Sequence, residues 1–276
     1  WLPWRPGLAS LEKSEGDAQQ IVWHDPETGE EEILVSADQL IPHGEDSPLK
    51  IDNFQFSDGG LRLLIYTNSK RVWRKKTRGD YWVLDTTTSE LKQLGGDVKP
   101  ASMMFATFSP DGTRVCYASA SNLYVQNLRN LEVIQLTQDG CSNIINGSFD
   151  WVYEEEFRLR KGFRWSPDGN SVAYWQLNTE GVGEFNLINN TDSLYPKLKP
   201  IKYPKAGDQN SSCRLGVVGS GGGVTKWLQV QGDPRNHYLA SMDWIKHPKE
   251  IVFQQLNRLQ NSVKVMLGNP MTGESK

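Results

Sequence analysis

Three stretches of this sequence follow one pattern: FSDGGLRLLIY from Phe56, FSPDGTRVCYAS from Phe108 and WSPDGNSVAYWQ from Trp165. Each begins with an aromatic residue, continues with Ser, Pro, Asp or Gly residues that accept turn geometry, and ends with a strand of alternating apolar residues. This order predicts a β-hairpin in every copy. A weaker copy, WIKHPKEIVFQQ, starts at Trp244, and Trp1 is a candidate start for a further one.

The spacing of the copies suits a four-stranded antiparallel unit. The first two intervals are 52 and 57 residues, and the next is 79, which indicates an insertion. Further strand candidates, each closed by a polar turn, lie between the copies: YWVLD, LKQLGG, NLYVQNL and EVIQLTQDG. Such self-similarity in an all-β sequence is typical of a β-propeller. We expect an incomplete propeller over residues 1–276, with about four blades and the start of a fifth; a stacked β-sandwich array is the alternative.

The composition is that of a globular protein without a global charge preference. The 276 residues are 37% hydrophobic and include 10 Trp, 9 Tyr and 9 Phe, enough for a sizeable core. The net charge is -3, so nothing global favours nucleic acid or an anionic membrane surface. No apolar run is long enough for a membrane span, and the first residue is Trp1 rather than Met. We therefore expect a piece of a longer protein.

The acidic run DWVYEEEF, residues 150–157, is the main exception to the β pattern. Ser148 or Asp150 could cap a short helix here, and glutamates in its first turns would be favoured by the helix dipole. Neighbouring glutamates on a helix can flank one cation, and a primary ammonium, with three donors and one charge, fits. The alternative is that the three glutamates form outward salt bridges with the basic residues that follow, Arg158, Arg160 and Lys161.

A basic cluster at residues 70–78, SKRVWRKKTRGD in its context, carries six Lys and Arg residues around Trp73. Phosphate contacts are conceivable, yet nothing else in the sequence supports nucleic acid. A solvated hairpin loop is the simplest interpretation. One Arg held by its neighbours could still donate a planar fork to a carbonyl or carboxylate group.

Other chemistry finds little support. The Gly-rich residues 219–223 lack the Lys and Ser/Thr of a phosphate loop, and the four His residues, His247 among them, show no zinc spacing, so no metal or cofactor is expected. Cys116, Cys141 and Cys213 allow at most one disulfide, and Cys116 reads as a buried strand residue. No G-x-S-x-G elbow is present, so a serine hydrolase triad of the α/β-hydrolase kind cannot be assembled from this chain alone, and we expect no catalytic residue in it.

DWVYEEEF, followed by FRWSPDGNSVAYWQLN and DSLYPKLKPIKYPKAGDQNSSCRLGVV, resembles the N-terminal β-propeller of the dipeptidyl peptidase IV family of serine peptidases. The resemblance covers nearly the whole chain and is strongest over residues 150–218. It implies an eight-bladed propeller joined to a C-terminal α/β-hydrolase domain, and release of dipeptides with Pro or Ala in second place from peptide N-termini. The hydrolase domain, with its catalytic Ser, Asp and His, is expected outside this chain, which alone should be inactive.

The family motif assigns roles to three residues of this sequence. By the match, Glu155 and Glu156 bind the free α-ammonium of the substrate, and Arg74 contacts a backbone carbonyl of the bound peptide. The match gives Glu154 no such role, and we interpret it as structural. Anchoring the terminus fixes which peptide bond reaches the nucleophile, a positioning contribution.

The resemblance also suggests the setting in which the propeller acts. The expected partners are peptides with a free N-terminus, the hydrolase domain of the same polypeptide and, as an option, a second copy in a homodimer. The expected location is exported, periplasmic or membrane-anchored and facing outward. A non-catalytic propeller that binds peptides or proteins as a scaffold is the rival function.

Overall fold

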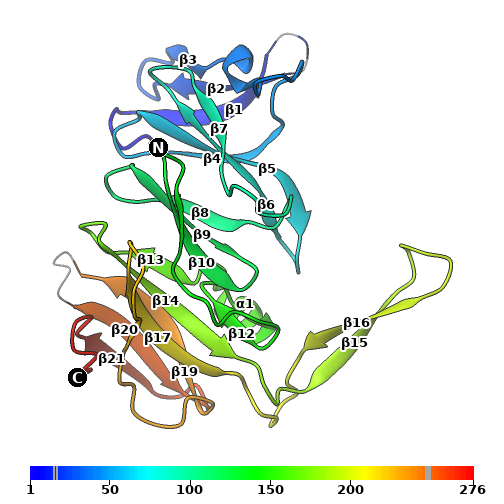
Figure 1. The fold of residues 1–276 in the computed structure, drawn as a ribbon, viewed down its shortest axis with the longest axis vertical. Coiled ribbons are helices and arrows are strands. Elements are labelled where there is room, and N and C mark those ends of the chain that lie inside the picture. The colour runs from blue at the N-terminus through cyan, green and yellow to red at the C-terminus, as the bar shows by residue number, and fades with distance from the viewer. Residues whose placement is uncertain (15, 17, 246–249) are drawn as a thin grey trace. The chain divides into compact units, whose positions relative to one another are not determined.

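The computed structural model describes residues 1–14, 16, 18–245 and 250–276 of the chain, and these residues form an almost entirely β structure (Figure 1). Consecutive strands pair in antiparallel sheets. The first sheet has the order β1 (Leu8–Lys13), β2 (Gln19–His24), β3 (Glu31–Val35), and a 3-10 helix, η1 (Ala37–Leu40), follows it. The predicted all-β class is confirmed.

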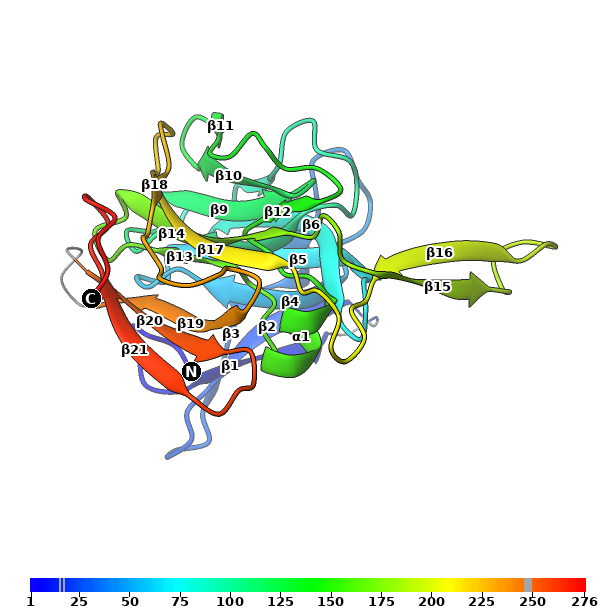
Figure 2. The same cartoon turned by 90° about the horizontal axis from the view of Figure 1, so that it is seen from below.

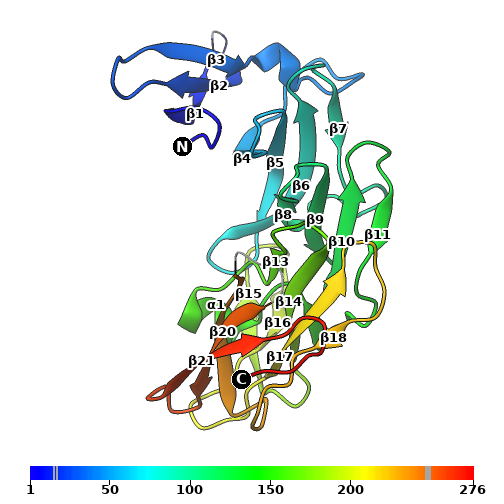
Figure 3. The ribbon, with the colours of Figure 1, turned by 90° about the vertical axis from the view of Figure 1, so that its left-hand side faces the viewer.

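The next two sheets each have four strands. One has the order β4 (Ile51–Phe56), β5 (Arg62–Arg71), β6 (Lys76–Asp85), β7 (Leu91–Gln93), and Figure 3 shows these strands side by side. The other has β8 (Met104–Phe108), β9 (Arg114–Ser119), β10 (Asn122–Asn127) and β11 (Val133–Gln135), with β11 and β8 at its edges. The four strand candidates found between the repeat copies correspond to β6, β7, β10 and β11.

The C-terminal half contains a larger sheet and a shorter one. The larger has the order β12 (Ile144–Asn146), β14 (Ser171–Asn178), β17 (Ser212–Gly219), β18 (Lys226–Trp227), and β13 (Phe163–Trp165) also pairs with β14. The shorter comprises β19 (His237–Trp244), β20 (Ile251–Asn257) and β21 (Val263–Gly268). The four sheets that begin at β1, β4, β8 and β12 agree with about four blades, and the sheet of β19, β20 and β21 agrees with the start of a fifth.

The insertion expected from the 79-residue interval is a separate hairpin. Strands β15 (Glu184–Asn189) and β16 (Lys197–Lys202) pair only with each other among the described residues. They form a long ribbon that extends away from the sheet containing β14 and β17 (Figure 1, Figure 2). Many of its apolar side chains are exposed; they are Phe185, Leu187, Ile188 and Leu198.

The repeat motif builds its turn from buried serine side chains. Ser109 is 3% exposed; its hydroxyl donates a 2.5 Å hydrogen bond to the Asp111 carboxylate and accepts one of 3.0 Å from the N–H of Arg114. Gly112 takes a φ of 66°, a conformation that glycine adopts at little cost. Ser166 makes the equivalent bonds in the next copy, at 2.6 and 2.9 Å. The hairpins predicted from the first three copies are confirmed, while turn residues 246–249 of the fourth, including His247, lie outside the described residues.

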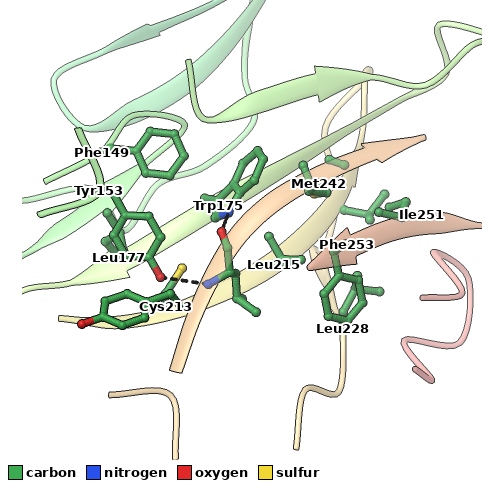
Figure 4. Packing of buried hydrophobic residues seen from close by; sticks show 14 of the residues in the cluster. Phe149, Tyr153, Trp175, Leu177, Cys213, Leu215, Leu228, Met242, Ile251 and Phe253 are labelled. Atoms are coloured by element: carbon green, nitrogen blue, oxygen red, sulfur yellow. Dashed lines mark hydrogen bonds between the residues drawn. The ribbon is translucent and has the colours of Figure 1, made fainter. Parts of the chain in front are cut away.

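The chain divides into two compact units, residues 1–119 with 124–134 and residues 120–123 with 135–276. We call them the first and the second unit. The core of the second unit packs β14, β17, β19 and β20 together (Figure 4). In it the indole N–H of Trp175 donates a 2.8 Å hydrogen bond to the carbonyl of Leu239, and the N–H of Leu239 donates one of 3.1 Å to the hydroxyl oxygen of Tyr153. This core fixes the strands beside which the candidate site lies.

Three further observations bear on function. Among the described residues, no helix has the length and apolar character that crossing a membrane requires. Cys116, Cys141 and Cys213 are all free thiols, and Cys116 is buried on β9 as expected. No group of three or more His, Cys, Asp or Glu side chains in the described part of the chain is arranged to hold a metal ion.

Candidate functional site

The acidic run forms α1 (Trp151–Phe157), the one α-helix among the described residues. Asp150 is its N-cap: the carboxylate accepts a 3.0 Å hydrogen bond from the N–H of Tyr153. This settles the choice between Ser148 and Asp150 that the sequence left open. The second carboxylate oxygen of Asp150 accepts a 2.6 Å bond from the hydroxyl of Ser211, the residue before β17. The start of the helix is thereby tied to the sheet.

The buried face of α1 anchors it to the core. Val152, Tyr153 and Glu154 are buried there. The hydroxyl oxygen of Tyr153 accepts the hydrogen bond from the backbone N–H of Leu239 (Figure 4), and burial raises the pKa of this phenol well above its ordinary value. A seven-residue helix is marginal by itself in water, so these contacts hold its orientation.

The helix ends at Arg158, which takes the left-handed conformation with a φ of 57°. Its N–H, and the N–H of Leu159 at 3.2 Å, donate to the carbonyl of Tyr153. These backbone bonds close the last turn of the helix.

The three glutamates have different surroundings. Glu154 is buried, with a side chain 7% exposed, and its carboxylate accepts a 3.1 Å charged hydrogen bond from Arg160. The alternative interpretation, outward salt bridges from all three glutamates, is met for Glu154 only in its partner, Arg160, because the Glu154 carboxylate is buried. Glu155 is half-buried and Glu156 is exposed. Since successive helical side chains point about 100° apart, this adjacent pair can flank one small cation.

Aromatic side chains from another segment pack beside Trp151, the first residue of α1. The rings of Trp151 and Tyr203 have centroids 4.2 Å apart, and Tyr203 also contacts Phe185 at 5.8 Å. Tyr203 directly follows β16, and Phe185 lies on β15. The base of the β15–β16 hairpin therefore packs against α1.

The basic cluster forms the end of the β5–β6 hairpin in the first unit. The N–H of Val72 donates a 3.1 Å hydrogen bond to the carbonyl of Lys75, which closes the turn that presents Arg74. Arg74 is exposed. Like charges face each other below it, since Lys70 pairs with Arg78 and Arg71 with Lys76 across the strands. Like charges directly opposite each other destabilise a sheet, so stabilising the hairpin does not explain this cluster.

The predicted site residues thus fall in two places. Glu155 and Glu156 are consecutive on α1 in the second unit, whereas Arg74 lies in the first unit, and their common action is part of the proposal below. Two contributors were missed from the sequence. Ser211 and Tyr203 lie 61 and 52 residues from the side chains that they contact, Asp150 and Trp151, and no local pattern announces such pairs.

Comparison with known proteins decides the family. Residues 57–276 match the family described as "Dipeptidyl peptidase IV (DPP IV) N-terminal region". The chain belongs to this family. The resemblance carried by DWVYEEEF is confirmed.

Relatives and solved structures agree with this assignment. The chain is 30% identical over 227 residues to dipeptidyl aminopeptidase B of Saccharomyces cerevisiae, covering 80% of this chain and 27% of the relative. It is 34% identical over 166 residues to a probable dipeptidyl-aminopeptidase B of Penicillium rubens, covering 56% of this chain and 18% of the relative. The chain therefore spans about a quarter or less of the length of such curated relatives.

The crystal structure of Porphyromonas gingivalis dipeptidyl peptidase 4 matches 98% of this chain and 38% of its own, with 27% identity and a TM-score of 0.87. A putative dipeptidyl aminopeptidase IV from Bacteroides ovatus has the same fold, with a TM-score of 0.69 at 22% identity over 98% of this chain and 38% of its own. The predicted propeller class, with a short helix that carries the Glu motif, is confirmed.

Proposed function

We propose that this chain is the part of a dipeptidyl peptidase that gates substrates and recognises their N-terminus, in an enzyme that releases Xaa-Pro or Xaa-Ala dipeptides. The observation that carries the proposal is the adjacent pair Glu155 and Glu156 on a helix anchored at both ends. Membership of the dipeptidyl peptidase IV family and the aminopeptidase names of the relatives support it.

The chemistry of the pair suits an ammonium group. A protonated α-amine is compact, carries one charge and donates three hydrogen bonds, so two carboxylates can share it. Glu154 is buried and paired with Arg160. The proposed ammonium ligands are its two neighbours on α1, Glu155 and Glu156. A peptide with a blocked N-terminus offers no positive charge and should be rejected.

Recognition of the N-terminus determines which peptide bond of the substrate is cleaved. If the ammonium is fixed on α1, only the peptide bond two residues away reaches a nucleophile placed at a set distance, which is catalysis by positioning. We propose that the nucleophile belongs to a hydrolase domain of the same polypeptide that cleaves by acyl transfer. The greater length of the relatives supports a further domain. Arg74 is proposed to orient a backbone carbonyl of the bound peptide through its planar fork.

The test is substitution in the full-length protein. Glu155→Ala and Glu156→Ala should each lower kcat/KM on a Gly-Pro reporter by about 30-fold or more, because losing one partner of a charge pair that the bound peptide covers costs about 2–5 kcal/mol. Glu180→Ala, at another exposed glutamate of the second unit, is the control and should keep full activity.

Circular dichroism should be the same for all three variants and the parent. Near-normal turnover by both site variants would reject the role of the pair. A full-length parent that binds such peptides without cleaving them would favour the scaffold function instead.

A further inference from the structure

The contact between Trp151 and Tyr203 lies on the face of α1 that carries Glu155. Trp151 and Glu155 are four residues apart, so they share one face of the helix. Helical side chains point toward the N-terminus, which places the Glu155 side chain over the turn that contains Trp151. Tyr203 packs on that same turn, with ring centroids 4.2 Å apart and planes inclined by 46°.

Tyr203 is itself held in place from two directions. Its N–H donates a 2.8 Å hydrogen bond to the carbonyl of Gly183, at the base of the β15–β16 hairpin. Its ring contacts Phe185, the second residue of β15. The tyrosine thus transmits the position of the hairpin base to the first turn of the helix.

The other anchors of α1 act elsewhere on the helix. Asp150 fixes the start of α1, and Tyr153 and Glu154 fix its buried face through Leu239 and Arg160. Trp151 and Phe157 also pack against the core cluster, so the motion left to α1 is a small rotation about its own axis. The aromatic contact opposes this motion on the face that presents Glu155.

We propose that Trp151 and Tyr203 are positioning residues for amino-terminus recognition: their contact fixes the rotation of α1 and so the direction of the Glu155 carboxylate. The inference rests on the proposed function, because it assigns the two aromatic residues a role in the same ammonium site. They act through Glu155 and do not touch the reacting atoms.

The experiment isolates the ammonium contact. Inhibition constants of alanyl pyrrolidide and of propionyl pyrrolidide, which lacks the amino group, are measured on the full-length enzyme. Their ratio, which we call the ammonium factor, reports the binding gained from the amine alone. It does not change when a variant merely contains less folded enzyme.

Trp151→Ala and Tyr203→Ala should each lower the ammonium factor by about five-fold or more, the scale of one aromatic pair. Trp151→Phe and Tyr203→Phe, which keep a ring, should restore it to within about two-fold of the parent. Tyr195→Ala is the matched control: this tyrosine lies on the same hairpin segment and is 78% exposed, and its loss should leave the factor unchanged.

The outcomes separate the two proposals. Glu155→Gln must lower the ammonium factor if the proposed function is right; an unchanged factor there overturns both. A factor lowered by Glu155→Gln but unchanged in Trp151→Ala and Tyr203→Ala overturns the positioning role alone. Should Trp151→Ala not fold, Tyr203→Ala decides, because Tyr203 lies after β16 and outside the core cluster.

Discussion

The hydroxyl of Ser211 donates a 2.6 Å hydrogen bond to the carboxylate of Asp150, and this contact joins the cap of α1 to the start of β17. Asp150 is 7% exposed, so the bond lies in a nearly dry environment. A charged cap in such a place favours the helix but is costly to ionise. The stability of the site should therefore depend on the protonation of Asp150.

Burial raises the pKa of Asp150, although the hydrogen bonds from Ser211 and from the backbone of Tyr153 oppose the shift. The folded protein thus holds the proton more tightly than the unfolded chain, in which the pKa is about 3.9. Stability contributed by this group falls as the pH rises from about 4 through the folded pKa. In Asp150→Asn this loss is absent, so the unfolding temperature of the variant should rise relative to that of the parent as the pH is raised from 4 to 7.

Asp168 provides a control of opposite sign. The hydrogen bond from Ser166, together with the N–H of Asn170, lowers the pKa of Asp168. Its contribution is present above pH 4 or so and is lost as the pH falls through the folded pKa. The unfolding temperature of Asp168→Asn should therefore fall relative to that of the parent as the pH rises over the acid range. Thermal unfolding from pH 3 to 7 that gives both variants the same slope would contradict the prediction.

The pair of Glu154 and Arg160 should matter more than an exposed ion pair. Arg160→Met keeps the apolar stem but leaves a carboxylate that is 7% exposed without its guanidinium. We expect a loss of about 1–3 kcal/mol in the free energy of unfolding, between the ranges for exposed and fully buried pairs. The contact of Lys202 with Glu184, at 3.0 Å and with both side chains exposed by 30% or more, is the comparison.

Lys202→Met should cost no more than about 1 kcal/mol, as is usual for a solvated pair. Both variants can be compared by urea denaturation monitored through tryptophan fluorescence. Adding Glu154→Gln to Arg160→Met should recover part of the loss, because the unpaired charge is removed. Equal losses in Arg160→Met and Lys202→Met would mean that burial does not increase the contribution of the Glu154–Arg160 pair to the free energy of unfolding.

The turn of the repeat motif offers a test of the fold. Gly112 has a φ of 66°, and a β-carbon there would lie 3.1 Å from the β-carbon of Ser57. Gly112→Ala should therefore cost about 1–2 kcal/mol of stability. Gly59, in the turn of the first copy, has no such conformation and open space around its β-carbon position. Gly59→Ala should stay within about 0.5 kcal/mol of the parent, and a comparable loss would contradict the explanation.

The repeat made the fold predictable from the sequence. Ser109 and Asp111 bond with each other, and Ser109 also bonds with Arg114 of the same turn, so the motif encodes its geometry locally. The capped helix was predictable for the same reason, since Asp150 and Tyr153 are three residues apart. The separate hairpin was foreseen only as an insertion of unknown form.

Long-range contacts were beyond the sequence. Nothing local distinguishes Glu154 from its two neighbours, yet packing against the core buries it beside Arg160. The same holds for Tyr203, whose ring contacts that of Trp151 although the β15–β16 hairpin lies between the two residues in the sequence. Which glutamate is structural was implied by family resemblance, and the buried pair now supplies a physical reason.

Arg74 tests whether the basic hairpin acts on substrate. Its turn is closed by the bond from Val72 to Lys75, and the hydroxyl of Tyr66 donates to the carbonyl of Arg78 at 2.7 Å, so the backbone beneath the turn is ordered. Because hydrogen bonds that involve a charged group are worth about 1.5–3 kcal/mol, Arg74→Ala in the full-length enzyme should lower kcat/KM by roughly 10- to 150-fold.

Lys75→Ala, next to it in the same turn, should lower kcat/KM less than about two-fold, since a solvated lysine offers no planar fork. Lys76→Ala should also have little effect, because its 3.7 Å contact with Asp52 is a solvated pair. Arg74→Lys completes the series: it keeps the charge, so full recovery would indicate simple electrostatic attraction. Continued loss in Arg74→Lys would indicate the fork, and equal small effects in all four variants would make the cluster a solvated loop.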